Sequence, residues 1–502
     1  KSEKTPLSRQ LDRFSRRLTF LVLILLVIVF VIGLLLGKPP LEIFTTSVAL
    51  AVSAIPEGLL VGLTVILAIG MQRILKRKGL VRNLVSAETL GGVTTICVDK
   101  TGTLTEGKMK VVDVLGNREE LAKQAILAND MDDPVVLAAW DWAEKVVDSP
   151  EELKKAYGRL DSIPFSSEYQ FFASLNSWWK DQNIIFINGA PEVIMEKCEL
   201  SVEDQKKIQQ EIDEQTSEGK RLIGMARKMV SEDKKELAQE DTKAELEWMR
   251  ILAFTDPVRA DVKKKKKKTS KAGIRLMVIT GDYAKTAQAV MKRLDLEIPV
   301  ENVVLGDQLK EMSEKELLNL ITGTGKPLLF ARTKPNQKLK IVEVLKRNGE
   351  VVAMMGDGVN DAPAVSKADI GIVVAEASDV AKESADLVLL DSSFSTIVAA
   401  IEEGRGIFNN ARKVILFLMC DAFEGIFLVL VSTVMRLPLP VTAMQILWIN
   451  LISDGFPNLA LTVDPKTPDI MQRPPRSPKE DLVAPWMYKL IGVVSLTGGV
   501  TA

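Results

Sequence analysis

The feature that most constrains this chain is an uninterrupted apolar run near its N-terminus. Residues 20–36 read FLVLILLVIVFVIGLLL, which is 17 residues without a charged side chain. A helix must be about this long to cross the ~30 Å hydrocarbon core of a bilayer. The run follows a basic amphipathic segment, LSRQLDRFSRRL, whereas a secretory signal would have a short apolar core and a small-residue cleavage site. We therefore expect this part of the chain to span a membrane.

Further apolar stretches occur in both terminal regions of the chain. They are residues 41–69, 414–435, 441–461 and a last stretch that begins near Trp486. Glu42 and Glu57 are the charged residues of the first of them, and the two in the C-terminal region contain more carboxylates. This pattern predicts an α-helical membrane bundle with several spans.

The distribution of basic residues indicates which side faces the cytoplasm. The short loops on one side of the spans hold only Lys38 and Arg436. Cytoplasmic loops carry the excess of Lys and Arg, so the opposite side is expected to be cytoplasmic. That side carries Arg13, Arg16, Arg17, the basic run 76–82, Arg405, Arg412, Lys413, Arg473 and Arg476. The sequence therefore predicts a multi-pass membrane protein whose large polar segment, residues 76–413, lies in the cytoplasm.

Short apolar runs precede small polar loops within this polar segment. They are residues 94–99, 274–282, 350–358 and 368–374. Such runs indicate buried parallel strands, and the helical stretches between them indicate a doubly wound α/β sheet. About 140 residues with many aromatic side chains, 117–250, separate the first strand from the others. We expect these residues to form a second domain inserted into the first.

Composition excludes several kinds of chemistry. The chain has 65 Lys and Arg against 66 Asp and Glu, a net charge of −1, so no nucleic acid partner is expected. It contains no histidine, which excludes imidazole ligands and Ser-His or Cys-His nucleophile pairs. Its cysteines, Cys97, Cys198 and Cys420, are too far apart to form a CxxC motif. Catalysis must therefore use carboxylates, lysines, hydroxyls or a bound metal.

Three acidic motifs follow the expected strands. They are DKTGTLT from Asp99, TGD ending at Asp282, and GDGVNDAP with Asp357 and Asp361. Ligands of open α/β sheets bind beyond the carboxyl ends of the strands, so these carboxylates are expected to converge. Glycines in the motifs allow backbone N–H groups to approach phosphate oxygens, and clustered carboxylates require a cation such as Mg²⁺. The motifs therefore predict a phosphate and Mg²⁺ site.

With these three motifs together, the chain resembles the P-type cation-transporting ATPases over essentially all of its length. The resemblance implies ATP and Mg²⁺ as cofactors and Asp99 as the nucleophile that accepts the γ-phosphoryl group, for which a carboxylate is chemically competent. It implies that Asp99, Thr101 and Asp357 bind Mg²⁺ and that Lys100 and Lys338 screen the negative charge of the phosphate. It also implies phosphate contacts from Thr280 and Gly281, in the motif of Asp282. By the same resemblance, Asn360 and Asp361 complete the pocket.

A phosphatase or mutase of the wider haloacid dehalogenase group is the alternative enzyme, since it shares this sheet and nucleophile. Those enzymes usually carry a second Asp two positions after the nucleophile as general acid and base, and Thr101 occupies that position here. A phosphoaspartate without that base should persist, as a pump cycle requires. A membrane scaffold with a nucleotide-responsive head is the non-enzymatic alternative.

The inserted segment resembles the nucleotide-binding domain of the same family. Phe165 in IPFSSEYQ is expected to stack on adenine, and Arg221 in GKRLIGMA to reach phosphate. The motif NGAPE, with Asn188 and Gly189, stands where the family usually has KGAPE, and Val136 stands where a glutamate is usual. These two departures predict weaker ATP binding.

Carboxylates within the apolar stretches are candidates for binding the transported ion, because a charge inside a membrane is costly. Pro56 breaks its helix beside Glu57, and freed carbonyl oxygens with a carboxylate suit a hard cation. The resemblance implies the carbonyls of Val52, Ser53 and Ile55 as further ligands. Two more sets share a helix face: Asp421 with Glu424, and Asn450 with Ser453 and Asp454.

The expected cation is Ca²⁺, because PEGL and NLISDG resemble the calcium-pump branch. An oxygen-only ligand set argues against copper or zinc. Asp421 stands where calcium pumps typically have Asn, and PEGLL also resembles the sodium and potassium pumps. Pumps for Na⁺, K⁺, Mn²⁺ or Mg²⁺ therefore stay open as alternatives.

The expected architecture is a membrane helical bundle, a haloacid dehalogenase-like, Rossmann-type α/β phosphorylation domain, and an inserted α+β nucleotide-binding domain. The third and fourth family spans are expected at 1–83, the phosphorylation domain at 84–116 and 251–400, the nucleotide-binding domain at 117–250, and the fifth, sixth and start of the seventh spans at 401–502. The family also has an actuator domain with a TGE motif and two spans before it, and we expect these to be a missing portion of the same protein. Membrane lipid is an expected partner. Six lysines, 263–268, replace an amphipathic helix and are expected to form a solvated segment.

Overall fold

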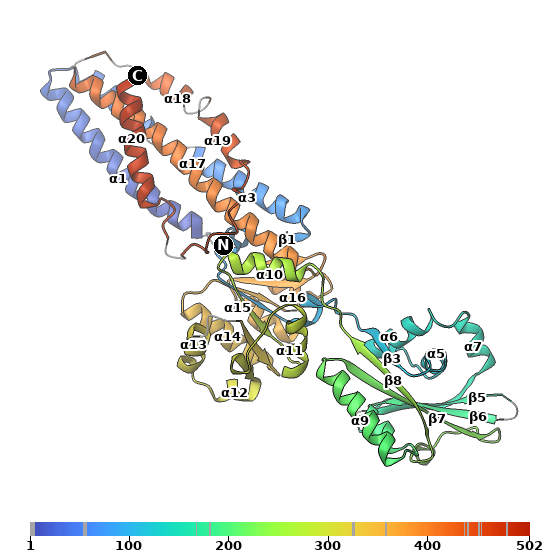
Figure 1. Cartoon of the computed structure of the whole chain (residues 1–502). Coiled ribbons are helices and arrows are strands. Elements are labelled where there is room, and N and C mark those ends of the chain that lie inside the picture. The colour runs from blue at the N-terminus through green and yellow to red at the C-terminus, as the bar shows by residue number, and fades with distance from the viewer. Residues whose placement is uncertain are drawn as a thin grey trace.

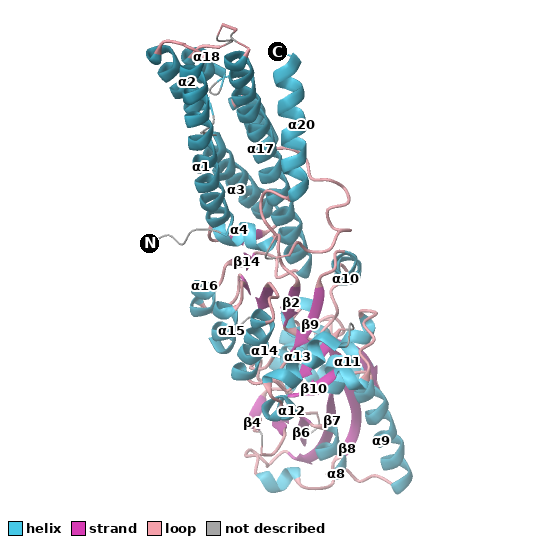
Figure 2. Cartoon of the chain, turned by 90° about the vertical axis from the view of Figure 1, so that its left-hand side faces the viewer, coloured by secondary structure: helices cyan, strands magenta, loops and turns pink. Residues whose placement is uncertain are grey.

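The structure is a computed structural model. It describes residues 6–53, 58–166, 168–179, 182–323, 327–356, 359–435, 437–438, 441–449, 452, 454–477 and 480–501. A bundle of long helices lies at one end, an α/β domain adjoins it, and a second body with an antiparallel sheet lies beyond that domain (Figures 1 and 2).

The bundle contains α1 (Pro6–Leu35), α2 (Pro40–Ser53), α3 (Gly58–Lys76), α17 (Phe394–Val434), α18 (Ala443–Trp448), α19 (Gly455–Thr462) and α20 (Pro485–Thr501). Among the described residues, two helices are long and apolar enough to cross a membrane, namely residues 14–35 of α1 and the 41-residue α17. Helices α2 and α3 lie in the apolar stretch 41–69, and α18 and α19 lie in the stretch 441–461. Residues 54–57, 450, 451 and 453, between the members of these pairs, lie outside the described residues.

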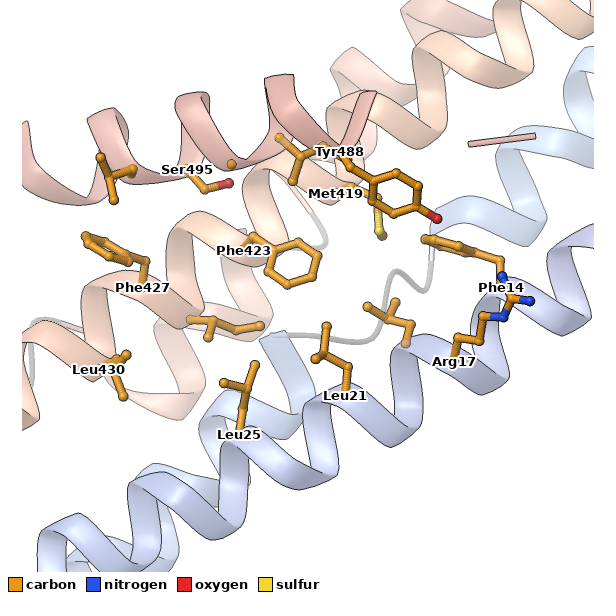
Figure 3. A pocket seen from close by; sticks show the side chains of 15 residues that line it. Phe14, Arg17, Leu21, Leu25, Met419, Phe423, Phe427, Leu430, Tyr488 and Ser495 are labelled. Carbon is orange, nitrogen blue, oxygen red and sulfur yellow. The ribbon is translucent and has the colours of Figure 1, made fainter. Parts of the chain in front are cut away.

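Three of these helices enclose an apolar cavity of about 470 Å³. Leu21 and Leu25 of α1 face Phe423 and Phe427 of α17, and Tyr488 of α20 closes one side (Figure 3). Arg17 and Tyr488 lie at one end of the cavity, and the Ser495 hydroxyl is the polar group further along it (Figure 3).

The α/β domain is built on an eight-stranded sheet with the order β1-β14-β13-β12-β2-β9-β11-β10. All neighbouring strands are parallel except β1 and β14. The strands are β1 (Gly79–Val81), β2 (Thr95–Val98), β9 (Arg275–Ile279), β10 (Val303–Leu305), β11 (Leu328–Ala331), β12 (Val352–Met355), β13 (Ile370–Val374) and β14 (Leu387–Leu389). The four strands expected from the sequence are therefore confirmed as β2, β9, β12 and β13.

Strand order determines where a ligand can bind to this sheet. β2 lies between β12 and β9, and the chain runs from β2 to β9 on one side before it returns to β12 on the other. Such a reversal leaves a crevice at the carboxyl ends of the central strands. The covering helices are α4 (Leu84–Leu90), α10 (Val262–Lys271), α11 (Ala284–Arg293), α12 (Gly306–Glu311), α13 (Glu314–Gly323), α14 (Pro335–Arg347), α15 (Ala362–Lys367) and α16 (Asp379–Ser384).

The inserted body is a six-stranded antiparallel sheet with the order β3-β8-β7-β6-β5-β4. The chain enters it through β3 (Lys110–Leu115) and leaves through β8 (Glu247–Thr255), which are neighbours, so both crossings lie side by side. The other elements are α5 (Arg118–Leu127), α6 (Pro134–Ala143), α7 (Pro150–Ala156), β4 (Arg159–Ile163), β5 (Phe171–Ser177), β6 (Gln182–Gly189), α8 (Pro191–Glu196), α9 (Val202–Ser217) and β7 (Arg221–Ser231).

The lysine run is helical, and it packs on the protein. It forms most of α10, where Val262 and Thr269 are buried against the sheet domain. Lys266 donates to the carbonyl oxygens of Leu294 and Asp295 at the end of α11. The expectation of a solvated segment is therefore wrong for one face of the run: lysine favours helix formation, and a few buried positions are enough for packing.

Candidate active site

The first acidic motif begins where β2 ends. All four residues of β2 are buried, and Asp99 follows in extended conformation before a short helical turn, η1 (Lys100–Leu104). Gly102 in this turn has φ of +73°, a conformation that glycine adopts without steric cost. The Asp99 carboxylate consequently stands at the carboxyl edge of the sheet with its side chain 15% exposed.

Lys338 holds two of the predicted carboxylates together. It lies about one helical turn after Pro335 in α14. The fixed φ of proline suits the first position of a helix. Its Nζ atom lies 2.8 Å from Asp99 Oδ2 and 2.9 Å from Asp361 Oδ1. Burial disfavours the ammonium group, but the carboxylates of Asp99 and Asp361 outweigh burial and raise the pKa of Lys338. Lys338 therefore stays charged and neutralises carboxylates that would otherwise repel each other.

A second pair of opposite charges lies at the end of β9. Lys100 is buried, and its Nζ atom lies 2.6 Å from Asp282 Oδ2. The Thr280 hydroxyl accepts a hydrogen bond from the Asp282 N–H at 3.2 Å, which shapes the turn. A Cβ atom at Gly281 would lie 3.9 Å from the nearest neighbour, so the turn leaves open space at the strand end.

The structure brings together Asp99, Lys100, Asp282, Lys338 and Asp361, with Thr280 and Gly281 beside them. A Cβ atom at Gly356 would lie only 2.5 Å from the Cβ of Asp361, so glycine is required where β12 approaches that residue. Asn360 is exposed next to Asp361. Asp357 and the side chain of Thr101 lie outside the described residues.

The donors at this site fit a hard cation such as Mg²⁺. They are carboxylate oxygens, and Oδ1 of Asp99 has no hydrogen-bond partner among the described residues, whereas Oδ2 contacts Lys338. The described residues contain no group of three or more Cys, Asp or Glu arranged to hold a metal ion. Of the three predicted Mg²⁺ ligands, only Asp99 has a described side chain. The side chain of Thr101 and all of Asp357 lie outside the described residues.

Two residues without a predicted role fix the segment that leads into the inserted body. Asp256 accepts hydrogen bonds from the Thr105 hydroxyl and, at 2.9 Å, from the Gly107 N–H. Arg259 donates to the carbonyl oxygens of Thr105 at 2.9 Å and Gly102 at 3.3 Å. Both residues belong to DPVR, which directly follows β8. An acidic and a basic residue close together where the chain leaves the inserted body could have indicated this role from the sequence. The pair connects the Asp99 loop to both crossings.

A cavity of about 660 Å³ opens in the inserted body, and the four predicted nucleotide residues all line it. Phe165 is 58% exposed, and Arg221 stands at the start of β7 with no partner for its guanidinium among the described residues. Val136 lines the same cavity. An exposed aromatic ring and an unpaired guanidinium suit a planar base and a phosphate group.

Asn188 has a structural role in this cavity. Its Nδ2 atom donates to the carbonyl oxygen of Ala128 at 2.8 Å, and its Oδ1 atom accepts from Gln124 Nε2 at 2.8 Å. A Cβ atom at the next residue, Gly189, would lie 2.5 Å from the carbonyl oxygen of Gln170, so only glycine fits there. Asn188 is therefore fixed at the cavity wall by both ends of its amide.

In the bundle, the structure brings together carboxylates from two helices. Asp421 and Glu424 lie on one face of α17, as predicted, and the Asp421 carboxylate contacts that of Asp454 at the start of α19. Asp454 is buried. The predicted ligands Ile55, Glu57, Asn450 and Ser453 lie outside the described residues, and so do the side chains of Val52 and Ser53 at the end of α2.

Two family models match this chain. A haloacid dehalogenase-like hydrolase model matches residues 93–369, and a model of the C-terminus of cation-transporting ATPases matches residues 438–502. The first covers more than half of the chain and contains the sheet with Asp99, Asp282 and Asp361, which defines the class as haloacid dehalogenase-like. The chain therefore belongs to the haloacid dehalogenase-like hydrolases, and within that class it is similar to the P-type cation-transporting ATPases, calcium pumps among them.

Curated relatives agree with this assignment. The chain is 35% identical over 98% of its length to a cation-transporting ATPase of Synechocystis, and 36% identical over 97% to calcium-transporting ATPase 1 of Yarrowia lipolytica. It is 34% identical over 96% of its length to a calcium-transporting ATPase of Bacillus subtilis. The chain spans 60%, 58% and 60% of the lengths of these three relatives.

Proposed function

We propose that this chain carries the catalytic and ion-binding part of an ATP-driven cation pump that transports Ca²⁺ through an aspartyl-phosphate intermediate. The observation that carries the proposal is the Asp99 carboxylate at the carboxyl end of β2, held at 2.8 Å by Lys338 and accompanied by Asp361. The names of the relatives, two of which are calcium-transporting ATPases, support the choice of ion.

The first step is phosphoryl transfer to Asp99. Its Oδ1 atom attacks the γ-phosphorus of ATP, the new O–P bond forms, and the bond to the bridging oxygen breaks so that ADP leaves. Lys338 holds the other oxygen of Asp99, and Lys100 adds a second positive charge, so that the approaching phosphate meets a compensated carboxylate. Asp99, Thr101 and Asp357 would hold Mg²⁺, which would supply further neutralisation of the phosphate charge.

Nucleotide binding is assigned to the cavity of residues 117–250. Phe165 stacks on the adenine, Arg221 contacts phosphate, and Asn188 and Gly189 form the wall. This cavity lies in the inserted body, whereas Asp99 follows β2 of the α/β domain. A nucleotide in the cavity has to present its γ-phosphate to Asp99 across the crossing that Asp256 and Arg259 fix.

A test of this assignment is Phe165→Ala, with Trp179→Ala as the control. Both rings are exposed, at 58% and 68%, but only Phe165 lines the cavity. Base stacking on an aromatic ring contributes about 1–3 kcal/mol, so ATP affinity measured by calorimetry should fall roughly tenfold or more in Phe165→Ala. Equal affinities in the two variants would contradict the assignment.

The ion site is assigned to Asp421, Glu424 and Asp454 with Glu57, Asn450, Ser453 and the carbonyls of Val52, Ser53 and Ile55. Carboxylates in contact within an apolar bundle need a cation or a proton between them. The setting is supported by α1, whose large apolar side chains on one stripe, Phe20, Leu23, Val27 and Val31, are 47–66% exposed. Water would penalise such a stripe, whereas lipid would not.

The proposal places the bundle in the membrane as a multi-pass unit and the α/β and inserted bodies in the cytoplasm. Its test is acid-stable labelling from γ-labelled ATP that hydroxylamine removes, repeated over a titration of Ca²⁺, Mn²⁺, Na⁺ and K⁺. Labelling that depends on micromolar Ca²⁺ supports the proposal. Labelling that requires another of these ions would change the ion, and no label under any condition would contradict the mechanism.

A further inference from the structure

A second polar cavity, of about 420 Å³, lies where the bundle meets the α/β domain. Residues of α17 and of the segment between α19 and α20 line it. Of the described residues in the lining, five are charged: Arg405, Arg412, Arg473, Arg476 and Glu480. Arg473 and Arg476 also pair with carboxylates outside the lining, Asp469 and Glu88, so the cavity keeps a net positive charge through Arg405. It is distinct from the sites assigned to phosphoryl transfer, nucleotide and transported ion.

Two of the guanidinium groups share one aromatic ring. Arg476 lies 3.7 Å and Arg412 lies 4.6 Å from the ring centroid of Phe408. Their side chains are only 19% and 18% exposed. Arg412 pairs with Glu480, and Arg476 pairs at 3.6 Å with Glu88, which does not line the cavity. Two like charges are thus held close together with little water to screen them.

Arg405 adds a positive charge that no described carboxylate neutralises. Its side chain is 7% exposed and donates to the carbonyl oxygens of Ile470, Arg473 and Ala272 at 2.7–3.1 Å. Burial lowers the pKa of its guanidinium, because the charged form is poorly solvated there. An anion in the adjoining cavity would stabilise this buried charge.

The cavity lies at the depth where lipid headgroups are expected. Arg412 precedes the apolar run 414–435 of α17 by two residues, which is about 3 Å along a helix axis. Phosphate groups of a bilayer lie just outside its hydrocarbon core. Ile470, Pro474 and Pro475 give the same cavity an apolar wall. A ligand with a phosphate group and an apolar part would match both features.

We propose that this cavity binds a phosphate group between Arg412, Arg473 and Arg476, supplied in the membrane by an anionic phospholipid of the cytoplasmic leaflet. The lipid source rests on the proposed membrane setting, whereas the phosphate chemistry does not. Such a lipid would connect the base of α17 to the loop before α20, and so would link the bundle to the α/β domain through Arg405.

The test uses the full chain in neutral detergent, titrated by calorimetry with dihexanoylphosphatidylglycerol and, separately, with inorganic phosphate. The variant is Arg473→Gln, and the matched control is Arg347→Gln. Both arginines are exposed, at 65% and 62%; Arg473 pairs with Asp469, and Arg347 pairs with Glu314 and, at 3.9 Å, with Glu343. Saturable binding of the lipid should weaken roughly tenfold in Arg473→Gln and stay unchanged in Arg347→Gln.

Arg412→Gln provides a second variant, with thermal unfolding measured to verify that it is folded. Lipid binding without measurable phosphate binding identifies the phospholipid as the source, and mutual competition of the two ligands identifies the phosphate group as the shared determinant. No saturable binding of either ligand, or equal affinities in Arg473→Gln and Arg347→Gln, would overturn the proposal. Labelling of Asp99 by ATP should persist in Arg473→Gln, so a failure of the lipid site is distinguishable from a failure of the pump mechanism.

Discussion

The carboxylates at the end of the sheet and those in the bundle are compensated in opposite ways. Asp99 and Asp361 share the ammonium group of Lys338, and Asp282 pairs with Lys100. Asp421 and Asp454 contact each other, and the described residues supply neither of them with a lysine or arginine. The sheet site is neutralised by the protein itself, so it is organised before any ligand arrives. The bundle carboxylates need a cation or proton from outside, which is what the proposed ion site requires.

The largest expected effect tests the role of Asp99 at the compensated site. We expect Asp99→Asn to abolish hydroxylamine-sensitive labelling from ATP, because the amide keeps the shape of the side chain but removes the attacking oxygen anion. ATP affinity should stay within about twofold, since the nucleotide cavity is on the inserted body. The exposed Asp295→Asn serves as the control and should label normally. Persistent labelling in Asp99→Asn would place the nucleophile elsewhere.

Removal of Lys338 tests whether the sheet site depends on its internal cation. Lys338→Met should destabilise the folded chain by about 3–5 kcal/mol, because it leaves Asp99 and Asp361 buried without compensation. Labelling should fall roughly a hundredfold or more. Lys346→Met, in the same helix but 30% exposed, is the control and should change unfolding by less than about 1 kcal/mol. A Lys338→Met variant as stable as this control would show that the sheet carboxylates do not depend on an internal cation.

In the bundle, removal of a charged side chain should have the opposite effect and stabilise the folded chain. Asp421→Asn removes one of two contacting carboxylates, so without added cation it should raise the unfolding midpoint by roughly 2–4 °C. The same variant should require about tenfold more Ca²⁺ to activate labelling, because a ligand charge is lost. Asp379→Asn, which is fully exposed, serves as the control. A lower midpoint in Asp421→Asn would mean that the carboxylate pair stabilises the fold and is not an ion site.

The smallest effect concerns the pH dependence of stability. The pKa of Lys338 is raised in the folded chain, so its contribution to stability is complete below its ordinary pKa of about 10.4 and is lost as pH rises through the folded value. The difference in unfolding free energy between the wild-type chain and Lys338→Met should therefore be constant from about pH 7 to 10 and narrow above it. Denaturant unfolding at a series of pH values measures this difference. A difference that widens above pH 10 would contradict the sign of the shift.

The sequence located the strands and the acidic motifs well because both are local signals. The runs that became β2, β9, β12 and β13 are continuous and apolar, as fully buried parallel strands must be, and the motifs stand directly after them. The strands β1, β10, β11 and β14 were not found. Three of them have only three residues and β11 is no longer than β2, so their pairing partners decide that they are strands.

The lysine run shows where a local signal was misleading. The absence of an apolar stripe argued against packing of residues 263–268, yet Lys266 caps the end of α11 and Lys268 pairs with Glu402 at 2.7 Å. This outcome depends on neighbours from other parts of the chain.

The sequence alone determined the class of this protein, the positions of four strands of its main sheet, and the residue types available for chemistry, because apolar patterning and motif spacing are properties of short segments. Tertiary structure decided which charges compensate one another. Lys338 reaches Asp99 across 239 positions of sequence, and the arginine cavity combines α17 with a loop some 65 residues later. Ion pairing and burial depend on distances in space, which the packing of the sheet and the bundle sets and which no local pattern encodes.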